Sequence, residues 1–336
     1  MRILVIRYRF IGDTVLAIPF LRNLRRAFPD AVIDVLAEPV SGDTLAHCPY
    51  KNELLYYAPR LRGPAKAAAE FPTSLWACAR RLRARRYDRV YILRRSFSSA
   101  ILPLLAGIPH RVGFATEGRR WLLQRSAPYP DKHEVECFLD ILRADGIPVV
   151  DTYNENWSDP ATDARVAAAL APDAGSRVFV CVKSTYPPKD WVPARFAEII
   201  AWLVNRRGCA VHFCDAPGSS IHYREVLAAV PAPLRQPCVD WSSRLPVRDV
   251  NSLMRRMDLA VGVDTGLLHI AASFHVPVVA LFGPLEPWRW HPWDTAHTVL
   301  RPADPSGPHP LERLSVAEVQ AAIDRHLPNA SAAPPP

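Results

Sequence analysis

Short apolar runs that alternate with helical segments along the whole chain are the feature that most constrains its fold. Continuous apolar strands separated by helices are typical of parallel sheets covered by helices on both faces. The predicted strands are Ile3–Ile6, Val32–Leu36, Leu54–Tyr57, Val90–Leu93, Val178–Val182, Val211–Cys214, Leu259–Val263 and Val278–Phe282. The predicted helices are 13–28, with a kink or restart at Pro19, then 72–86, 133–145, 161–170, 193–207, 220–230, 247–257, 267–274 and 316–327. We therefore predict an α/β fold of doubly wound, Rossmann-like sheets.

The segment 151–176 separates two halves of the chain, because it is rich in Asp, Pro, Asn and Ala. A chain of 336 residues suits two domains of about 150 residues each. We therefore expect one domain at 1–155 and a second at 156–328, followed by a disordered tail at 329–336. The two domains would face each other across a cleft, with ligands bound outside the carboxyl ends of the strands.

Positive charge is concentrated in the first half of the chain. Residues 1–150 hold 24 Lys and Arg against 14 Asp and Glu, whereas the remainder holds 17 basic and 19 acidic residues. A basic half suits an anionic partner such as a nucleic acid, phospholipid head groups or an acidic glycolipid. One cluster of arginines is interpreted by itself as the solvated face of a helix: Arg80, Arg81, Arg83, Arg85 and Arg86.

The seven cysteines are scattered, without a C-x-x-C pair, so reduced thiols in a cytoplasmic protein are expected. Arg7 and Arg9 interrupt the apolar start, so no signal peptide is predicted. The uncharged stretch 265–285 is broken by His269 and Pro277, and it is predicted to form a buried helix and a strand rather than a membrane span.

Several common catalytic motifs are absent from the sequence. The chain has no G-x-G-x-x-G, no P-loop lysine motif, no H-E-x-x-H and no G-x-S-x-G. Their absence argues against a dinucleotide-dependent dehydrogenase, a P-loop phosphotransferase, a zinc protease and a serine hydrolase.

The sharpest local signal is D-T-G-x-x-H, which follows the predicted strand 259–263. Asp264, Thr265 and Gly266 come directly before a helix, and His269 lies one turn into it. Helix amino termini present unpaired N–H groups and a positive dipole end, which together bind phosphate. The pattern favours an anion site, although Asp264 could instead cap the helix and His269 could be a packed core residue.

A second candidate follows the predicted strand 178–182. Ser184 and Thr185 supply hydroxyls, and Lys189 follows on a turn stiffened by Pro187 and Pro188. Hydroxyls and an ammonium at the carboxyl end of a strand suit a pyrophosphate. The alternative is that Lys189 is an exposed surface lysine.

The chain resembles the lipopolysaccharide heptosyltransferases, which are inverting glycosyltransferases of the GT-B architecture. The resemblance lies in the opening "ILVI…GD" followed by "LRNLRRAFPDAVIDVLA", in Lys189-Asp190-Trp191, and in D-T-G-x-x-H-I-A-A followed by A-L-F-G-P. The stretch "YILRRSFSSAILPLLAGIPHRVGF" is similar to the heptosyltransferase II branch. The similar segments occur in order from Ile3 to Pro284.

The resemblance implies roles for the residues singled out above. The donor would be a nucleotide sugar, ADP-heptose, held by Ser184, Thr185, Lys189, Asp264, Thr265, Gly266 and His269. Asp13 would be the general base on the acceptor side, although it could instead cap the helix that follows. The implied chemistry is single displacement with inversion, without a metal or another cofactor.

The implied acceptor is the anionic inner core of lipopolysaccharide, which suits the basic first half. The arginines expected to bind it, or else to serve only surface solubility, are Arg94, Arg95, Arg111 and Arg120. We expect a cytoplasmic protein in peripheral contact with the anionic inner face of the inner membrane. Nucleic acid is not an expected partner, because the basic residues show no recognition motif.

Two other functions fit the same architecture. A sugar-nucleotide epimerase would act on the nucleotide sugar alone, whereas a transferase needs an acceptor. A non-catalytic glycolipid-binding protein would bind donor or acceptor without turnover.

Overall fold

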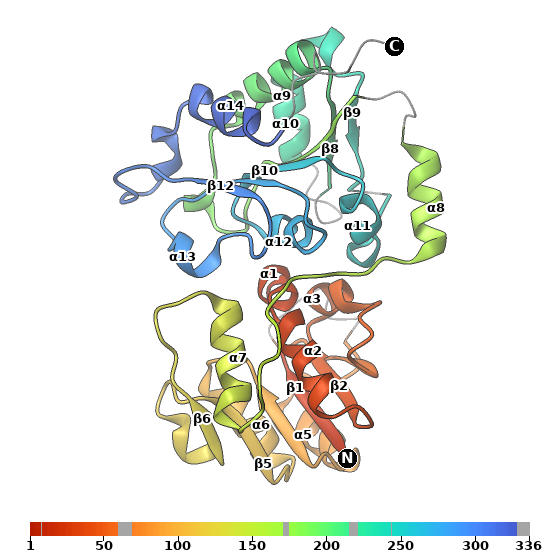
Figure 1. The fold of residues 1–336 in the computed structure, drawn as a ribbon, viewed down its shortest axis with the longest axis vertical. Coiled ribbons are helices and arrows are strands. Elements are labelled where there is room, and N and C mark those ends of the chain that lie inside the picture. The colour runs from red at the N-terminus through yellow and green to blue at the C-terminus, as the bar shows by residue number, and fades with distance from the viewer. Residues whose placement is uncertain (8, 60–68, 171–174, 215–220, 243, 328–336) are drawn as a thin grey trace. The chain divides into compact units, whose positions relative to one another are not determined.

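The computed structural model describes the whole chain except residues 8, 60–68, 171–174, 215–220, 243 and 328–336. The predicted disordered tail therefore lies outside the described residues. The chain divides into two compact units, Met1–Glu155 and Asn156–Pro336. Figure 1 colours the first unit from red to yellow and the second from green to blue.

The first unit is built on a six-stranded sheet in the order β3-β2-β1-β4-β5-β6, and each neighbouring pair is parallel. Its strands are β1 (Arg2–Ile6), β2 (Val32–Ala37), β3 (Glu53–Tyr56), β4 (Arg89–Ile92), β5 (His110–Phe114) and β6 (Arg125–Ala127). Its helices are α1 (Ile11–Val15), α2 (Ile18–Ala27), α3 (Pro39–Gly42), α5 (Leu75–Ala84), α6 (Phe97–Leu105) and α7 (Glu134–Ala144), with short 3-10 turns η1 (Asp43–Leu45) and η2 (Arg119–Leu122).

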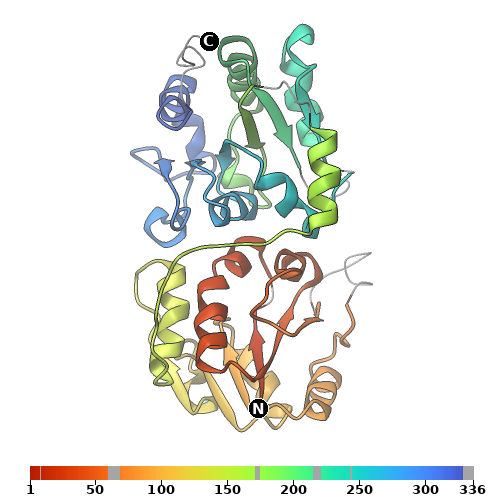
Figure 2. The same ribbon diagram turned by 45° about the vertical axis from the view of Figure 1, so that its right-hand side comes forward.

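Alternate side chains of the central strands enter different layers of this unit. Leu4 and Ile6 of β1 share one buried cluster with residues of α5 and α6. On α2, Phe20 packs edge-on against Tyr91 of β4, with ring centroids 5.7 Å apart. α2 and α7 contact each other and lie side by side in Figures 1 and 2. Helices therefore cover both faces of the sheet, as the continuous apolar strands require.

The second unit repeats the plan with a parallel sheet in the order β12-β11-β10-β7-β8-β9. Its strands are β7 (Arg177–Cys181), β8 (Ala210–Phe213), β9 (Cys238–Asp240), β10 (Leu259–Val263), β11 (Val278–Leu281) and β12 (His297–Leu300). Its helices are α8 (Pro160–Ala169), α9 (Pro193–Arg207), α10 (Ile221–Ala229), α11 (Val247–Met254), α12 (Gly266–Ser273), α13 (Pro287–Trp290) and α14 (Val316–Asp324), with 3-10 turns η3 (Pro187–Lys189), η4 (Ala232–Leu234) and η5 (Pro310–Arg313).

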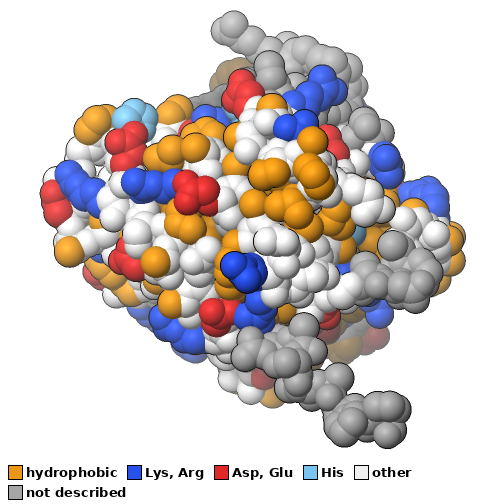
Figure 3. Space-filling view, turned by 90° about the horizontal axis from the view of Figure 1, so that it is seen from above, with side chains coloured by type: hydrophobic (Ala, Val, Ile, Leu, Met, Phe, Trp, Pro, Cys, Tyr) orange, Lys and Arg blue, Asp and Glu red, His pale blue; other side chains and the backbone are white. Residues whose placement is uncertain are grey.

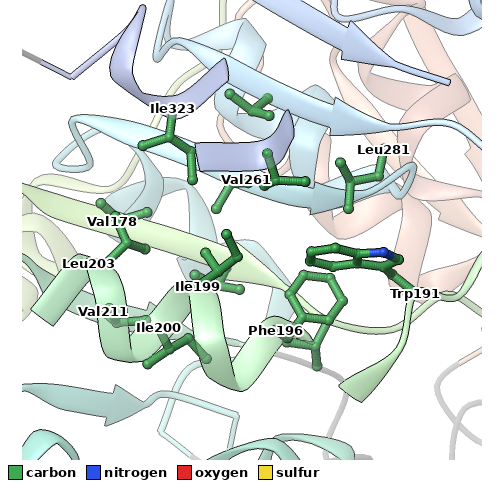
Figure 4. Packing of buried hydrophobic residues seen from close by; sticks show 14 of the residues in the cluster. Val178, Trp191, Phe196, Ile199, Ile200, Leu203, Val211, Val261, Leu281 and Ile323 are labelled. Carbon is green, nitrogen blue, oxygen red and sulfur yellow. The ribbon is translucent and has the colours of Figure 1, made fainter. Parts of the chain in front are cut away.

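The core of the second unit joins the sheet to α9 and α14. Figure 4 shows Val178, Val261 and Leu281 of the strands packed toward residues of these helices. Trp191 closes one end of the cluster, where it meets Phe196 edge-on with ring centroids 5.0 Å apart. The Trp191 indole also donates a hydrogen bond of 3.1 Å to the Leu314 carbonyl, which fixes the chain just after η3.

The predicted pattern of strands and helices is largely present. The predicted helix at 13–28 is two helices, and Pro19 occupies the second position of α2, so it marks a restart rather than a kink. The stretch 265–285 forms α12 and β11, as predicted. Within the described residues, no helix combines the length and apolar character that crossing a membrane requires. All seven cysteines are free thiols.

Candidate active site

The strand order locates a switch point in the second sheet. β7 and β10 are neighbours, and the strands that follow each of them extend the sheet in opposite directions. Ligands of doubly wound sheets bind at such a point, outside the carboxyl ends of the two strands. The loops that leave β7 and β10 there are the two segments singled out from the sequence, 182–189 and 264–266.

Gly262 allows the two strands to approach each other at this point. Its φ is +149°, and a Cβ atom there would lie 2.1 Å from the Cys181 carbonyl oxygen of β7. A side chain would therefore push β10 away from β7, and would separate the loops that follow them.

Lys189 and Asp264 form an ion pair that joins the two loops. The Lys189 Nζ lies 2.6 Å from Asp264 Oδ2 and 3.4 Å from the Asp264 carbonyl oxygen. The two side chains are only 15% and 7% exposed, so Lys189 is not an exposed surface lysine. Gly283 packs beneath this turn, where a Cβ would lie 2.9 Å from the Pro188 carbonyl oxygen. The ammonium is therefore held at the edge of the sheet by close backbone packing.

The amino terminus of α12 opens beside this ion pair. Thr265 is its N-cap in an extended conformation, without a side-chain capping bond, and its buried Oγ1 has no hydrogen-bond partner among the described residues. Asp264 precedes the cap and pairs with Lys189, so its predicted alternative role as the helix cap is wrong. The N–H groups of the first turn, together with the Thr265 hydroxyl, form a donor-rich site that suits an anion.

His269 lies one turn into α12, close to Asp264. Its Nε2 is 3.9 Å from Asp264 Oδ1, and the side chain is 5% exposed. Burial lowers the pKa of His269 to about 4, so the ring is neutral at pH 7. Its buried Nδ1 has no hydrogen-bond partner within the described residues. His269 can therefore offer an anion a hydrogen bond but not a positive charge.

Asp190 shapes the loop that carries the predicted hydroxyls. Its carboxylate pairs with Lys183 and accepts a 2.9 Å hydrogen bond from the Ser184 N–H. The Ser184 hydroxyl accepts a 3.2 Å hydrogen bond from the Tyr186 N–H, and Thr185 is exposed. The sequence reasoning gave no role to Lys183 or Asp190, although Asp190 lies within a segment that resembled the family.

A cavity of about 390 Å³ adjoins the same loop. Lys183, Asp190 and Trp191 line it from the loop, and His222 and His309 line it from α10 and the segment before η5. These two histidines belong to segments without a recognisable motif, so they could not be predicted from the sequence.

The first sheet has its own switch point, between β1 and β4. The loop after β1 has positive φ at Arg9 (74°) and Phe10 (54°), a conformation that is costly for residues other than glycine. It leads into α1, where Asp13 lies in the first turn and is not the N-cap, so a capping role for Asp13 is wrong. The strained loop instead presents Asp13 at the carboxyl edge of the sheet.

Arg7 holds the Asp13 carboxylate. The two side chains form an ion pair through Asp13 Oδ2, and Arg7 Nε donates a 3.3 Å hydrogen bond to the Asp13 carbonyl oxygen. Arg7 is buried, with its guanidinium 5.5 Å from the centroid of the Phe138 ring. Burial lowers the pKa of Arg7 to about 9, while nearby Glu134 acts in the opposite direction. Arg7 stays charged at pH 7 and engages one oxygen of Asp13.

The loop after β4 brings two of the four predicted acceptor arginines to the same edge. Arg94 and Arg95 are close enough to Arg7 to affect its pKa. The Arg95 guanidinium lies 4.4 Å from the centroid of the Tyr129 ring, whose hydroxyl donates to Glu134. The structure thus brings Asp13, Arg94 and Arg95 together.

The other two predicted acceptor arginines lie elsewhere in the first unit. Arg111 is near the amino end of β5, on the opposite edge of the sheet from Asp13. Its guanidinium donates to the carbonyl oxygens of Leu122 and Ile108, at 2.7 and 2.6 Å. Arg120 is exposed on η2 and lines a surface hollow with Ala144, at the carboxyl end of α7. Neither lies in the cluster around Asp13.

Two Rossmann-like units, each with charged side chains at the switch point of a six-stranded parallel sheet, define a two-domain α/β enzyme with the GT-B fold. A family model described as glycosyltransferase family 9 (heptosyltransferase) matches residues 75–314. The chain belongs to this family and is a glycosyltransferase. The family resemblance read from the sequence is confirmed. The matched range includes every predicted donor residue but begins after Asp13.

Individual relatives agree with the family match. The lipopolysaccharide heptosyltransferase 2 of Escherichia coli K12 is 27% identical over 307 residues, which cover 85% of this chain and 84% of that protein. The solved structure of E. coli ADP-heptose LPS heptosyltransferase II superposes with a TM-score of 0.81 at 24% identity, covering 97% of this chain and 98% of that one. The E. coli heptosyltransferase WaaC with ADP-2-deoxy-2-fluoro heptose gives a TM-score of 0.73 at 20% identity, over 97% of this chain and the whole of that chain. These two structures establish the shared fold.

Proposed function

We propose that this protein transfers a heptose from ADP-heptose to the inner core of lipopolysaccharide, with inversion at the anomeric carbon. The observation that carries the proposal is the Lys189–Asp264 ion pair beside the open amino terminus of α12, within the part of the chain that the heptosyltransferase family model matches. The relatives support the substrates, because lipopolysaccharide heptosyltransferases and a structure with an ADP-heptose analogue are among them.

The donor diphosphate binds at the switch point of the second sheet. The Lys189 ammonium turns from Asp264 toward the diphosphate, and the first N–H groups of α12 and the Thr265 hydroxyl donate to its oxygens. His269 adds a hydrogen bond without a charge, because its ring is neutral. Ser184 and Thr185 approach from the loop after β7. Donors fixed in this way stabilise the negative charge that develops on the leaving ADP.

Asp13 is the general base of the proposed mechanism. Arg7 engages Oδ2 of its carboxylate, so the other oxygen is available to accept the proton of the acceptor hydroxyl. The hydroxyl oxygen then forms the new bond to the anomeric carbon as the bond from that carbon to the diphosphate breaks. The proton goes to Asp13 and the electron pair leaves with ADP, so one displacement inverts the configuration.

Arg94 and Arg95 bind the anionic acceptor in this proposal, since both lie at the edge that carries Asp13. Guanidinium groups suit the phosphates and carboxylates of an inner core. Arg111 and Arg120 are left out because of their positions. The protein acts in the cytoplasm, in peripheral contact with the anionic inner face of the membrane that holds the acceptor lipid.

A donor screen with and without a core-lipid acceptor tests the function. A heptosyltransferase releases ADP from ADP-heptose only when acceptor is present, and the sugar appears on the lipid. Conversion of the nucleotide sugar without acceptor would identify an epimerase, and binding without turnover would identify a glycolipid-binding protein.

Asp13→Asn tests the base within the same assay. It keeps the size of the side chain and the contact with Arg7 but removes the basic carboxylate, so kcat should fall by a factor of about 10² to 10⁴. Near-normal kcat in Asp13→Asn, with ADP release still dependent on acceptor, would refute the role of Asp13 and leave the transferase function intact.

A further inference from the structure

One side of the first unit combines exposed aromatic residues with an excess of positive charge. α5 and α6 cover the same face of the sheet, and the Arg83 guanidinium donates a 2.8 Å hydrogen bond to the Leu105 carbonyl oxygen between them. Leu122 and Leu123, at the end of η2, pack against the same buried cluster. We call the outward surface of α5, α6, η2 and the start of β6 the α5–α6 face.

Each of the two helices presents a regular stripe on this face. Trp76, Arg80 and Arg83 follow one another at i, i+4 and i+7 along α5, and all three are exposed, whereas Cys78, Ala79 and Leu82 are buried. Phe97 and Leu104 are exposed at the same spacing along α6. α5 is therefore an amphipathic helix with a basic, aromatic outer side, and α6 adds an apolar stripe next to it.

The exposure of the tryptophans is unusually high. Trp76 is 71% exposed and Trp121, on η2, is 91% exposed. Phe97 and Leu104 are also among the exposed large hydrophobic residues. Holding this much apolar area in water is unfavourable, and a cluster of such residues on one face marks an interaction surface.

The charge of the α5–α6 face is mainly positive, and its acidic neighbour is the exposed Glu117, which accepts a 2.9 Å hydrogen bond from the Phe97 N–H at the start of α6. Its arginines are Arg80, Arg81 and Arg83 on α5, Arg120 on η2 and Arg125 at the start of β6, and α5, α6, η2 and β6 contain no Asp or Glu. None of these five arginines forms an ion pair with another described residue. By contrast, on the face that Figure 3 shows, seen from above relative to Figure 1, basic side chains lie among acidic and hydrophobic ones.

Exposed tryptophan next to unpaired arginine fits an anionic phospholipid bilayer. Trp rings settle at the level of the head groups, and basic residues nearby are attracted to anionic lipids. The face also reaches the acceptor edge, because α5 and α6 follow β3 and β4 and so begin at the carboxyl edge of the sheet, where Asp13 lies.

We propose that the α5–α6 face docks this enzyme on the anionic phospholipid surface in which its acceptor is embedded. Trp76 and Trp121 insert at the head-group level, and the arginines pair with lipid phosphates. The choice of a membrane as partner rests on the proposed function, but the residues are separate from those of catalysis. The cluster that was interpreted from the sequence as a solvated helix face thereby gains a binding role.

The full-length protein with lipid vesicles tests the proposal. Flotation with phosphatidylglycerol-containing vesicles is compared with flotation with pure phosphatidylcholine vesicles, at low and high salt. Trp76→Ala/Trp121→Ala and Arg80→Glu/Arg83→Glu are the test variants. Trp288→Ala and Arg224→Glu are the matched controls, because both residues are exposed on the second unit.

We expect binding to the anionic vesicles that weakens with salt. Each basic residue near such a surface strengthens binding about fivefold, so Arg80→Glu/Arg83→Glu should bind at least about twentyfold more weakly. The tryptophan pair should also lose most of its binding, and the two controls should bind like the wild type. Far-UV circular dichroism must show that the test variants are folded.

Three outcomes would overturn the proposal: no binding to anionic vesicles, equal binding to neutral ones, or unchanged binding by both folded test variants. Association of two copies through this face, seen by sedimentation and lost in the variants, would likewise replace the membrane with a protein partner. Heptosyl transfer to a lipid-free core oligosaccharide is measured separately. It should be unchanged in the test variants, so failure of vesicle binding is distinguished from failure of the proposed reaction.

Discussion

Lys189→Met separates the structural role of the Lys189–Asp264 pair from its role in donor binding. The substitution keeps an unbranched side chain one atom shorter and removes its charge, which leaves the Asp264 carboxylate 7% exposed beside the neutral His269. Breaking a fully buried pair costs about 3–5 kcal/mol, and the 15% exposure of Lys189 reduces this to about 2–4 kcal/mol. For a unit of this size, the Tm should fall by roughly 5–15 °C.

The same substitution should reduce catalysis by a different amount. Removing one fixed donor to a charged transition state costs about 10²–10³ in kcat. Lys189→Met should therefore lose that factor in ADP release, measured below the unfolding temperature, and should also bind ADP more weakly.

Lys189→Met/Asp264→Asn is the control for stability. It removes both charges, so most of the lost thermal stability should return while kcat stays low. If the double variant regains both stability and kcat, the pair is only structural. Normal kcat and ADP affinity in folded Lys189→Met would refute the assignment of Lys189 to the donor diphosphate.

Three further predictions follow from the described contacts. Because the pKa of His269 falls to about 4 on folding, the unfolded chain binds more protons than the folded chain between about pH 6.5 and 4. The free energy of unfolding, measured by urea titration, should therefore decrease by up to about 3 kcal/mol as the pH is lowered over that range. A folded His269→Gln variant should show a shallower decrease. Gly283→Ala should weaken ADP binding in calorimetry, because its Cβ displaces the turn that carries Lys189. In a Lys189→Met background the same substitution should weaken ADP binding little further. Unchanged affinity in the single variant would show that the turn tolerates the methyl group. Arg22→Met should lower the free energy of unfolding by about 2–4 kcal/mol, because the buried guanidinium pairs with Asp151 and with Glu155 at 2.6 Å, and Arg22→Lys should recover part of it.

The alternation of strands and helices could be predicted from the sequence because the central strands are apolar on both faces. β1, β2, β4, β7, β10 and β11 are buried along most of their length and stand out as continuous runs. β6 and β9 are three-residue strands at the ends of the two sheets, and β12 is also a terminal strand. An edge strand needs apolar residues on fewer sides, so none of these three carried a signal strong enough to be predicted, although the terminal strand β3 was predicted. β5 is an interior strand that was also not predicted, because it begins with His110 and Arg111 and only its last three residues are buried.

Part of the candidate site is formed by residues that are consecutive in the sequence, and part is formed by residues far apart in it. Only the first part could be recognised from the sequence as a unit. The D-T-G-x-x-H unit could be recognised because its strand, turn and helix are consecutive, and the structure keeps that order in β10, Thr265 and α12. The pairing of Lys189 with Asp264 joins positions 75 residues apart and depends on the order of β7 and β10 in the sheet. Periodicity and spacing do not specify strand order, so the sequence placed both residues at the donor without showing that they neutralise each other.

The predicted acceptor arginines show that residue type alone does not identify a binding residue. Arg94, Arg95 and Arg111 all belong to one stretch that resembles the family, but β5 begins at the edge of the sheet opposite to the one where β4 ends. Arg111 is therefore on the far edge from Asp13, where backbone carbonyl oxygens of Leu122 and Ile108 occupy its guanidinium. In a parallel sheet, a basic residue can meet a substrate at the switch point only if it follows a strand rather than begins one, and this rule selects Arg94 and Arg95 from the set.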